Sequence, residues 1–351
     1  MISTTPHSAF GRAILLLIAL LIVGCGSKEN EPPKKGPAED GKAKGPPIEA
    51  INDVTCLACS PDGRLVGVTY SNPGMVGVWD IQSGLANFEP NSGHFEQLVF
   101  TPDSLNLIGM GTPEKKMMIW NAKTGSGREV PLPPWKGGTR MSPFVTMSGD
   151  GKSAVSIYDE KKIVKLDVSG GKVDYFPNEI EYFRGAAYSP ALHLVAIGQY
   201  YPSHLLLIKL GEKSPNKKIP LPLKPRAIAF SKDGKTMALS LSEEEDKKRI
   251  DRVELWDTDG WKVRGTLPKK PGPDFRSYEI MALSEDGKFL AGVPYPDERC
   301  VELWDTTGRL VNTIENGDTP RALAFTPDGK TLIIGYRKQG LKLVDTAGKG
   351  K

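Results

Sequence analysis

The sequence predicts an all-β domain built from seven copies of one four-stranded antiparallel sheet. A short pattern of alternating small and large apolar residues, followed by Ser or Thr and a tight turn, recurs seven times at a mean spacing of about 44 residues. Glycine and proline, 38 and 29 of the 351 residues, suit a turn-rich β fold better than a helical one. With 39% hydrophobic residues, the chain has enough apolar side chains for a packed core.

The charge balance and the cysteine count exclude two other classes of protein. Lys and Arg number 46 and Asp and Glu number 42, which gives a net charge of +4. So small an excess gives no electrostatic case for nucleic acid as a partner. Four cysteines in 351 residues are too few for a disulfide scaffold.

The N-terminus predicts export. Residues 13–24 form an unbroken apolar run after a single charged residue, Arg12. At about 1.5 Å per residue, twelve helical residues reach about 18 Å, which is short of a bilayer core of about 30 Å. Residues 1–24 are therefore predicted to be a signal peptide rather than a membrane span.

The end of the apolar run, Ile-Val-Gly-Cys at residues 22–25, resembles the lipobox of bacterial lipoproteins. The resemblance implies cleavage before Cys25 and acylation of that residue, and two or more acyl chains make anchoring stable. The residue after the lipidated cysteine influences the final membrane, and an Asp there favours the inner membrane. This sequence has Gly26 at that position, which favours the outer membrane. The alternative is an ordinary secretory signal with an incidental cysteine. We expect an exported protein, lipid-anchored in the bacterial cell envelope.

Residues 26–47 contain no large apolar residue and carry five Lys, four acidic residues and five Pro. Such a segment cannot bury enough surface to offset the entropy of ordering it. Residues 25–47, the lipidated cysteine included, are therefore predicted to form a disordered tether. In an extended, polyproline-like form it would reach up to about 70 Å.

Each repeat opens its turn with Ser or Thr, at Ser60, Thr101, Ser148, Ser189, Ser231, Ser284 and Thr326. The clearest copies are PRAIAFSKDGKT (225–236) and PRALAFTPDGKT (320–331). Pro presets φ at the first turn position, Asp bonds the backbone, and Gly accepts a positive φ. Asp-Gly occurs in five of the seven copies, Asp103-Ser104 replaces it in the second, and the fourth lacks the pair. Each copy therefore predicts two strands joined by a tight turn.

A third strand follows each turn and ends with Trp in four copies: GVWD (77–80), MIWN (118–121), and ELWD at 254–257 and 302–305. A fourth, shorter strand follows most of them. Four-stranded repeats of about 44 residues with Trp-Asp endings resemble the WD40-repeat β-propeller family over about 300 residues. The Ser-Pro-Asp-Gly turns are also typical of TolB-like propellers. The resemblance implies a seven-bladed β-propeller.

The ends of the repeat region predict how the ring closes. After the seventh third strand only TAGKGK remains, so the last blade lacks its fourth strand. Residues 48–54 precede the first repeat and are predicted to supply that strand, because a closed ring leaves no strand edges exposed. Residues 48–351 are therefore expected to form one closed domain, not the two that the length favours.

Few residues point to catalysis. A metal site at His94 and His204 would need converging carboxylates, and isolated surface histidines, His193 included, are the alternative. Cys56 and Cys59 form C-x-x-C, but residues three apart in a strand face opposite sides, which favours small core residues over a redox or metal pair. No hydrolase triad, P-loop or dinucleotide motif appears. We expect no catalytic residue, no metal and no cofactor.

Two sets of residues predict a partner-binding rim on the top face, the face at which the first strand of each repeat begins. Second strands end near Tyr70, Tyr158, Tyr200, Tyr201, Tyr295 and Tyr336. The position that opens each first strand holds Thr55, Glu96, Pro143, Arg184, Arg226, Glu279 and Arg321. Because Tyr and Arg are enriched among binding hot spots, the tyrosines and the three arginines are expected to bind a protein or peptide segment.

Two alternatives remain for these polar residues. The arginine stems could instead cover the packing between blades and pair with neighbouring acids. The charged run 242–251 is predicted to extend a loop on the top face, as solvated chain or as a polar contact arm.

The sequence thus predicts a lipid-anchored envelope propeller that acts as a protein–protein interaction scaffold without catalysis. One alternative is an envelope assembly factor, analogous to TolB or to propeller lipoproteins of outer-membrane biogenesis. Another is a propeller enzyme, such as a lactonase or a quinone-cofactor dehydrogenase. Such an enzyme needs side chains that hold a metal or cofactor in the channel, and the first-strand positions offer no His and no ring of carboxylates.

Overall fold

The computed structural model describes residues 53–347 with gaps at 72–73, 84–85, 90–92, 112–115, 131, 133–143, 149, 160–161, 169–172, 178–182, 211–215, 246–247, 269–276, 296–298 and 316. The predicted signal peptide and tether lie outside these residues. Every regular element in the described part is a β-strand. No helix there is long and apolar enough to cross a membrane.

The first four sheets, which we call blades one to four, follow one another along the chain. Blade one contains β1 (Val54–Cys59), β2 (Leu65–Tyr70), β3 (Met75–Asp80) and β4 (Ala86–Glu89). Blade two contains β5 (Phe95–Phe100), β6 (Asn106–Gly111), β7 (Met117–Asn121) and β8 (Gly127–Val130). Blade three contains β9 (Val145–Met147), β10 (Ser153–Asp159), β11 (Lys162–Asp167) and β12 (Val173–Pro177). Blade four contains β13 (Phe183–Ser189), β14 (Leu194–Tyr200), β15 (Ser203–Lys209) and β16 (Lys217–Pro220).

The remaining sheets are blades five to seven. Blade five contains β17 (Lys224–Phe230), β18 (Thr236–Glu245), β19 (Lys248–Asp257) and β20 (Lys262–Thr266). Blade six contains β21 (Tyr278–Leu283), β22 (Phe289–Pro294), β23 (Cys300–Asp305) and β24 (Leu310–Glu315). Blade seven contains β25 (Pro320–Phe325), β26 (Thr331–Tyr336) and β27 (Leu341–Asp345).

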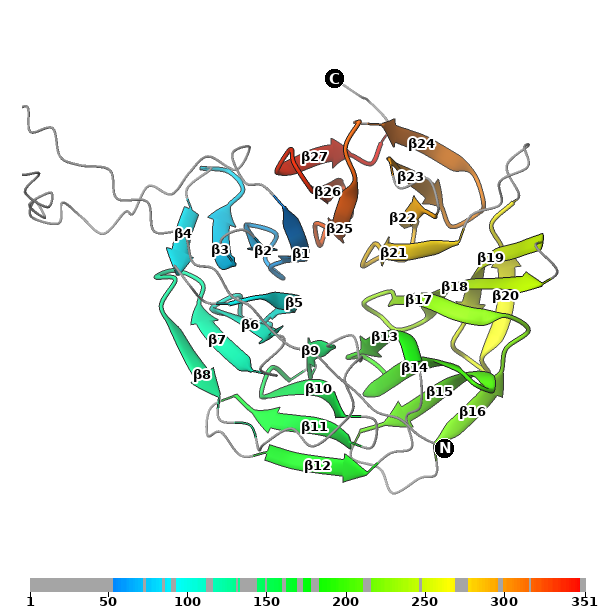
Figure 1. The fold of residues 1–351 in the computed structure, drawn as a ribbon, viewed down its shortest axis with the longest axis horizontal. Coiled ribbons are helices and arrows are strands. Elements are labelled where there is room, and N and C mark those ends of the chain that lie inside the picture. The colour runs from blue at the N-terminus through cyan, green and yellow to red at the C-terminus, as the bar shows by residue number, and fades with distance from the viewer. Residues whose placement is uncertain are drawn as a thin grey trace, which may run out of the picture. The chain divides into compact units, whose positions relative to one another are not determined.

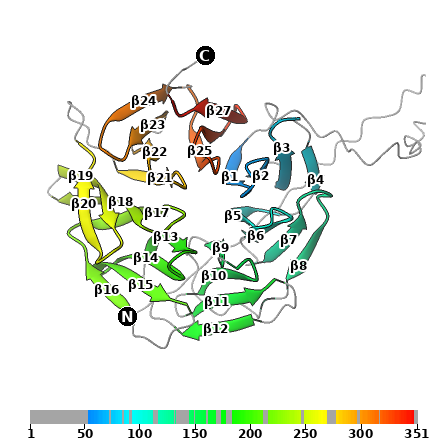
Figure 2. The ribbon, with the colours of Figure 1, turned by 180° about the vertical axis from the view of Figure 1, so that it is seen from behind.

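The seven blades stand around a central axis, and the first strand of each blade is innermost (Figures 1 and 2). Within every blade the strands pair antiparallel in chain order. β1 packs beside β5 on one side and beside β25 on the other, so the last blade meets the first. The prediction of a seven-bladed β-propeller is confirmed.

The junction of blades seven and one differs in detail from the prediction. Val54, predicted to belong to the closing strand, instead begins β1 of blade one. Residues 48–52 of the predicted closing strand lie outside the described residues, and blade seven has three strands among the described ones. The backbone N–H of Asp53 donates to the carbonyl of Arg337, which follows β26, at 2.5 Å. Backbone hydrogen bonding therefore links the two blades at this junction, which we call the seam.

The hydrophobic core lies between neighbouring blades. At the seam, Val54 and Trp79 of blade one pack in one cluster with Ile333 and Leu341 of blade seven. Side chains that interdigitate between facing sheets fill the space at close to crystal density. Each blade is therefore stabilised mainly by the blades beside it.

The predicted turns form as the sequence indicates. In the first, the Ser60 hydroxyl donates to an Asp62 carboxylate oxygen and accepts from the backbone N–H of Leu65 at 2.9 Å. The same Ser/Thr-to-Asp hydrogen bond recurs in five further blades. In blade two, Ser104 takes the glycine position with a φ of 61°, and in blade four the positive φ falls one position later, at His193.

We expect Gly335→Ala to loosen the seam. A Cβ added at Gly335 in β26 would meet the side chain of Val54 in β1, with Leu57 at 3.3 Å. Overpacking of this kind costs about 1–3 kcal/mol of the free energy of unfolding. Gly265→Ala is the matched control, because a Cβ there has nothing within 4 Å. Denaturant titration should show a loss for the first variant only, and equal stabilities would contradict the seam contact.

Candidate functional site

A β-bulge shapes the start of the inner strands. In six of the seven, the pairing with the second strand shifts register one or two residues after the strand begins. The unpaired residue of a bulge leaves the ladder and is re-aimed. The bulge residues are Thr55, Glu96, Arg184 (with Gly185), Arg226, Glu279 and Arg321. These are the positions that the repeat alignment selected, while Pro143 of blade three lies outside the described residues.

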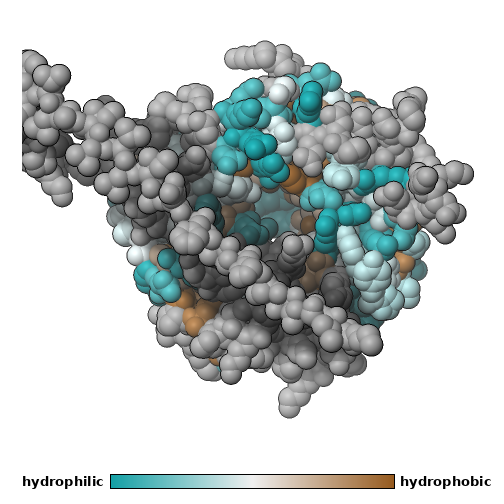
Figure 3. Space-filling view, viewed as in Figure 1, coloured by the Kyte–Doolittle hydropathy of each residue, from teal (hydrophilic) through white to brown (hydrophobic). Residues whose placement is uncertain are grey.

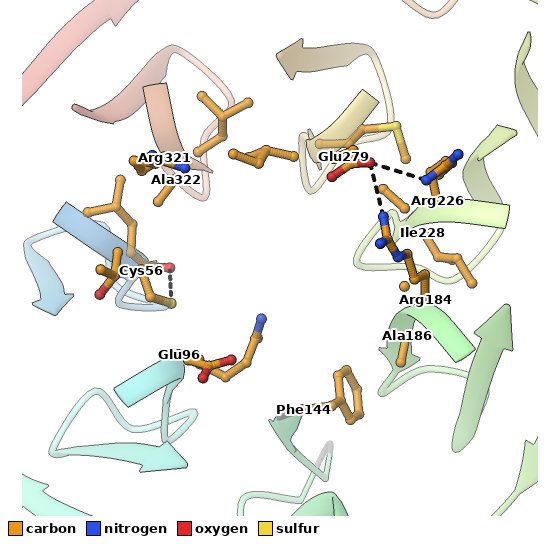
Figure 4. Close-up of a pocket in the computed structure, with 18 of the residues that line it drawn as sticks. Cys56, Glu96, Phe144, Arg184, Ala186, Arg226, Ile228, Glu279, Arg321 and Ala322 are labelled. Atoms are coloured by element: carbon orange, nitrogen blue, oxygen red, sulfur yellow. Dashed lines mark hydrogen bonds and ion pairs between the residues drawn. The ribbon is translucent and has the colours of Figure 1, made fainter. Parts of the chain in front are cut away.

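The bulge residues line a pocket of about 560 Å³ at the axis of the ring. We call this pocket the channel mouth. It also takes in small and apolar residues of the same strands, among them Cys56, Phe144 and Ala186 (Figure 4). On the face seen in Figure 3, hydrophilic residues border part of a central hollow in which hydrophobic residues are visible. The channel mouth therefore has a charged edge above an apolar wall.

Two arginines from neighbouring blades meet one carboxylate at the channel mouth. Arg184 Nη1 lies 3.1 Å from Glu279 Oε1, and Arg226 Nη1 lies 3.3 Å from the same oxygen. The three residues come from blades four, five and six (Figure 4). Two positive charges against one negative leave this group with an excess of one positive charge. The alternative drawn from the sequence, that the arginines pair with neighbouring acids, is therefore confirmed for Arg184 and Arg226.

Tyr200 lies beneath the two arginines. The guanidinium carbons of Arg184 and Arg226 are 5.9 and 5.8 Å from the centroid of its ring, within the range of cation–π attraction. Burial raises the pKa of Tyr200, and the two guanidinium groups act in the opposite direction. The Tyr200 hydroxyl and Arg226 Nε are buried, and neither has a hydrogen-bond partner among the described residues.

The other predicted tyrosines do not form one exposed rim. Tyr70 and Tyr336 are 7% and 1% exposed and belong to the core, where burial raises the pKa of both to about 12. Each is the last residue of its second strand, so the ladder holds its side chain between blades. Tyr201 and Tyr295 come one residue after the strand ends and are 61% and 36% exposed. The side chain of Tyr158 lies outside the described residues.

The segment 242–251, predicted as a loop, is largely a continuation of two strands. β18 and β19 pair as far as Glu245 and Lys248, so blade five carries a hairpin that is longer than its counterparts. The loop prediction is wrong because the acidic residues of the first half of this run pair with the second half across the hairpin, as Glu244 does with Arg249. Ile250 is 43% exposed.

Cations on both sides of this hairpin contact the two exposed tyrosines. Lys224 Nζ lies 5.4 Å from the Tyr201 ring centroid and bonds Glu243 at 2.8 Å. On the other side, Arg249 lies 4.5 Å from the Tyr295 ring centroid. We call Tyr201, Lys224, Arg249, Ile250 and Tyr295 the hairpin surface. Lys224 was not selected from the sequence, whereas Arg249 and Ile250 belong to the run 242–251 that was predicted as solvated chain or as a polar contact arm.

Arg249 is held firmly in place. Its Nε bonds both carboxylate oxygens of Asp251, at 3.0 and 2.8 Å, and its Nη2 bonds the hydroxyl of Ser277 at 2.8 Å. Asp251 and Ser277 are both buried. Hydrogen bonds to a charged group in a buried setting are stronger than exposed ion pairs. The cation beneath Tyr295 therefore has a fixed orientation.

The histidines and cysteines are placed separately. His94 and His193 are exposed, whereas His204 is buried with Nδ1 2.7 Å from the carbonyl oxygen of Pro202. Within the described ranges, no group of three or more His, Cys, Asp or Glu is arranged to hold a metal ion. Cys56 is buried and Cys59 partly buried, and both are free thiols. Burial raises the pKa of each to about 12.

The sequence of the first blade matches a known repeat. The pattern of the WD domain, G-beta repeat, matches residues 49–80. The first blade thus carries a WD40 repeat, and the described residues form a seven-bladed β-propeller. No curated protein matches it in sequence.

Solved structures show the same fold. Hydrazine synthase of Kuenenia stuttgartiensis is similar to this propeller with a TM-score of 0.71 and 16% identity, over 90% of this chain and 100% of that chain. The β-propeller domain of Cps50 (Swd1) from Myceliophteria thermophila is similar with a TM-score of 0.67 and 13% identity, over 84% and 99% of the two chains. At these identities the likeness extends to the fold alone.

We expect the Cys56 thiol to react slowly with iodoacetamide in the folded protein. The thiolate is the reactive form, and a pKa of about 12 leaves little of it at pH 8. Thiol labelling followed by mass spectrometry should show a rate at least about tenfold lower than in guanidinium. A thiol introduced one residue away by Thr55→Cys, on the exposed bulge, is the matched control. Equal rates at the two positions would contradict the burial of Cys56.

Proposed function

We propose that this propeller is a lipid-anchored interaction platform of the bacterial cell envelope, and that a protein partner docks on the top face over blades four to six. The WD40 fold is that of a protein-interaction scaffold. The apolar run at 13–24 and the lipobox-like residues ending in Cys25 support export and anchoring. The proposed platform has no catalysis of its own.

The hairpin surface carries the proposal of a docking face. Large apolar side chains that are exposed among the described residues are Leu105, Tyr201, Ile250, Val263, Tyr295 and Leu343. Three of these six surround the β18–β19 hairpin, where Lys224 and Arg249 add positive charge next to the aromatic rings. Tyr and Arg in such clusters dominate the binding energy of protein interfaces. Fixed cations under the rings also reduce the entropy lost on binding.

The lipid anchor supports the same function by a different physical effect. Two or more acyl chains hold a protein stably at a membrane, whereas one chain does so only marginally. Confinement to that surface raises the effective concentration of the platform for any partner in the same membrane. A docking surface of moderate affinity is then sufficient for the complex to form.

The lining of the channel mouth supports the absence of catalysis. Its described residues include three arginines and two glutamates but neither His nor Asp nor Lys. Nucleophilic or general-base chemistry usually needs a nucleophile and a base within hydrogen-bond reach of each other. The observed ion pairs instead join arginines to a carboxylate, as at a binding surface.

Cys25→Ala should abolish lipid attachment, because the acyl chains have no other predicted acceptor. Cells that express the full chain would be labelled with radioactive palmitate, and the protein recovered by immunoprecipitation. Cys56→Ala, which removes a buried thiol, should keep full labelling. Label retained by Cys25→Ala would refute anchoring at this residue.

The docking face is tested by photo-crosslinking in the native envelope. A crosslinking amino acid at position 250 should capture a partner, and the same amino acid at position 105, an exposed apolar site in a turn on the opposite face, should not. With the captured partner purified, Tyr201→Ala with Tyr295→Ala should weaken binding by at least about tenfold, as expected of hot-spot residues.

Leu105→Ala with Val263→Ala is the matched pair for that measurement, because these residues are also exposed and apolar. It should leave the affinity unchanged. Identical crosslinking at positions 250 and 105 would rule out the hairpin surface as the docking face. So would an unchanged affinity of a folded protein that carries the two tyrosine substitutions.

A further inference from the structure

We propose that Arg184 and Arg226 form a carboxylate clamp that takes an acidic side chain of the partner, and that Glu279 occupies the clamp in the unliganded protein. This inference rests on the proposed function, since it names the chemistry of the segment that enters the channel mouth. The direct observation is that one oxygen, Glu279 Oε1, accepts from both guanidinium groups. An internal carboxylate thus marks the position that a ligand carboxylate would take.

The clamp has more donors than Glu279 uses. A guanidinium group carries five N–H donors, and Arg184 and Arg226 each make one recorded side-chain hydrogen bond among the described residues. Arg226 Nε is buried without a partner there. Buried donors are almost always satisfied in native proteins, so an unmet one calls for an explanation. An incoming carboxylate with two oxygens would engage donors that a single glutamate oxygen leaves unused.

Tyr200 orients the clamp before a ligand arrives. Both guanidinium groups lie within 6 Å of its ring centroid, one from each side of the junction between blades four and five. Tyr200 also makes an edge-on contact with Tyr201 of the hairpin surface, with ring centroids 6.1 Å apart. The clamp and the docking face are therefore physically continuous. A partner that covers Tyr201 would bring its own side chains to the channel mouth.

The surrounding charge favours an anion. The clamp and Glu279 together carry one excess positive charge, and Arg321 of blade seven adds another exposed cation at the same pocket, with no ion pair recorded among the described residues. Glu96, the other acidic bulge residue, lies on blade two on the far side of the pocket (Figure 4). Arg321 also lies across the pocket from the clamp (Figure 4), so the excess positive charge at the clamp itself is that of Arg184 and Arg226 against Glu279.

Exchange of Glu279 for a ligand is energetically easy. Its side chain is partly exposed, as is that of Arg184, and exposed ion pairs contribute little because water screens them. A ligand carboxylate with two oxygens can also engage Arg226 Nε, which Glu279 leaves without a partner. Glu279 then acts as an internal competitor that lowers the affinity for any acidic segment.

Substitution of the competitor provides the sharpest test. The full chain in detergent would be titrated into a fluorescent peptide of alternating Glu and Gly, with fluorescence anisotropy as the readout. Glu279→Gln should bind this peptide about tenfold more tightly than the native protein, because the two arginines lose their internal carboxylate. Arg184→Gln with Arg226→Gln should lose the binding. A peptide with Gln in place of Glu should bind neither protein.

Matched controls remove the effect of net charge. Glu285→Gln makes the same change of charge and also frees a cation, because Glu285 pairs with Lys232 at 2.7 Å in turns on the opposite face. It should leave the affinity for the acidic peptide unchanged. A gain in Glu285→Gln equal to that in Glu279→Gln would overturn the clamp. Circular dichroism melts would confirm that each variant is folded.

Two further arms separate the alternatives. A phosphoserine peptide is tested beside the Glu peptide. If it binds more tightly, and if Glu279→Gln raises the affinity for the phosphoserine peptide alone, the clamp binds phosphate and the assignment to carboxylate is overturned. The crosslink at position 250 distinguishes this inference from the proposed function. If the crosslink persists while the native protein and Glu279→Gln show no preference for acidic peptide, the clamp is wrong and the docking face stands.

Discussion

The packing of seven inner strands around one axis is the constraint on which the rest of the structure depends. Each inner strand must approach its neighbours closely, and β1 must meet both β5 and β25 for the ring to close. Close approach is possible where a second strand carries glycine: Gly335 of blade seven contacts Val54 of blade one, and Gly198 of blade four contacts Pro225 of blade five. Small residues at these points let large ones fill the space between blades.

The same constraint explains why the charged residues gather at the channel mouth. A residue that continued the ladder at the start of an inner strand would point into the packing between blades. The bulge releases it, so Arg226 and Glu279 stand beside the axis while their neighbours Pro225 and Tyr278 remain buried. Six separate sheets thereby place their bulge residues in one pocket. The site follows from ring geometry, because no single blade contains it.

The sequence was sufficient for the features that repeat. Ser60 and its equivalents predicted the turns because a hydroxyl and a carboxylate two residues apart form the same local hydrogen bonds in six blades. The residues at the start of each first strand were also predictable, because alignment of the repeats places equivalent positions of the seven copies together. The exposure of the tyrosines was not predictable from the sequence. Tyr70 is the last residue of its strand, whereas the strand before Tyr295 ends one residue earlier. The long hairpin of blade five was missed for a related reason: charged residues such as Glu243 and Arg249 resemble loop until their cross-strand partners are known.

The bulges have a consequence for how such a protein can diverge. A side chain that has left the ladder contributes little to packing, and Arg184, Glu279 and Arg321 are all exposed. Substitutions at these positions leave the architecture intact and alter only the chemistry presented at the pore. Six bulge positions on one ring, three of them joined by ion pairs, thus present their side chains at a single pocket. Ligand preference can therefore drift between related proteins by single exchanges, without any intermediate that fails to fold.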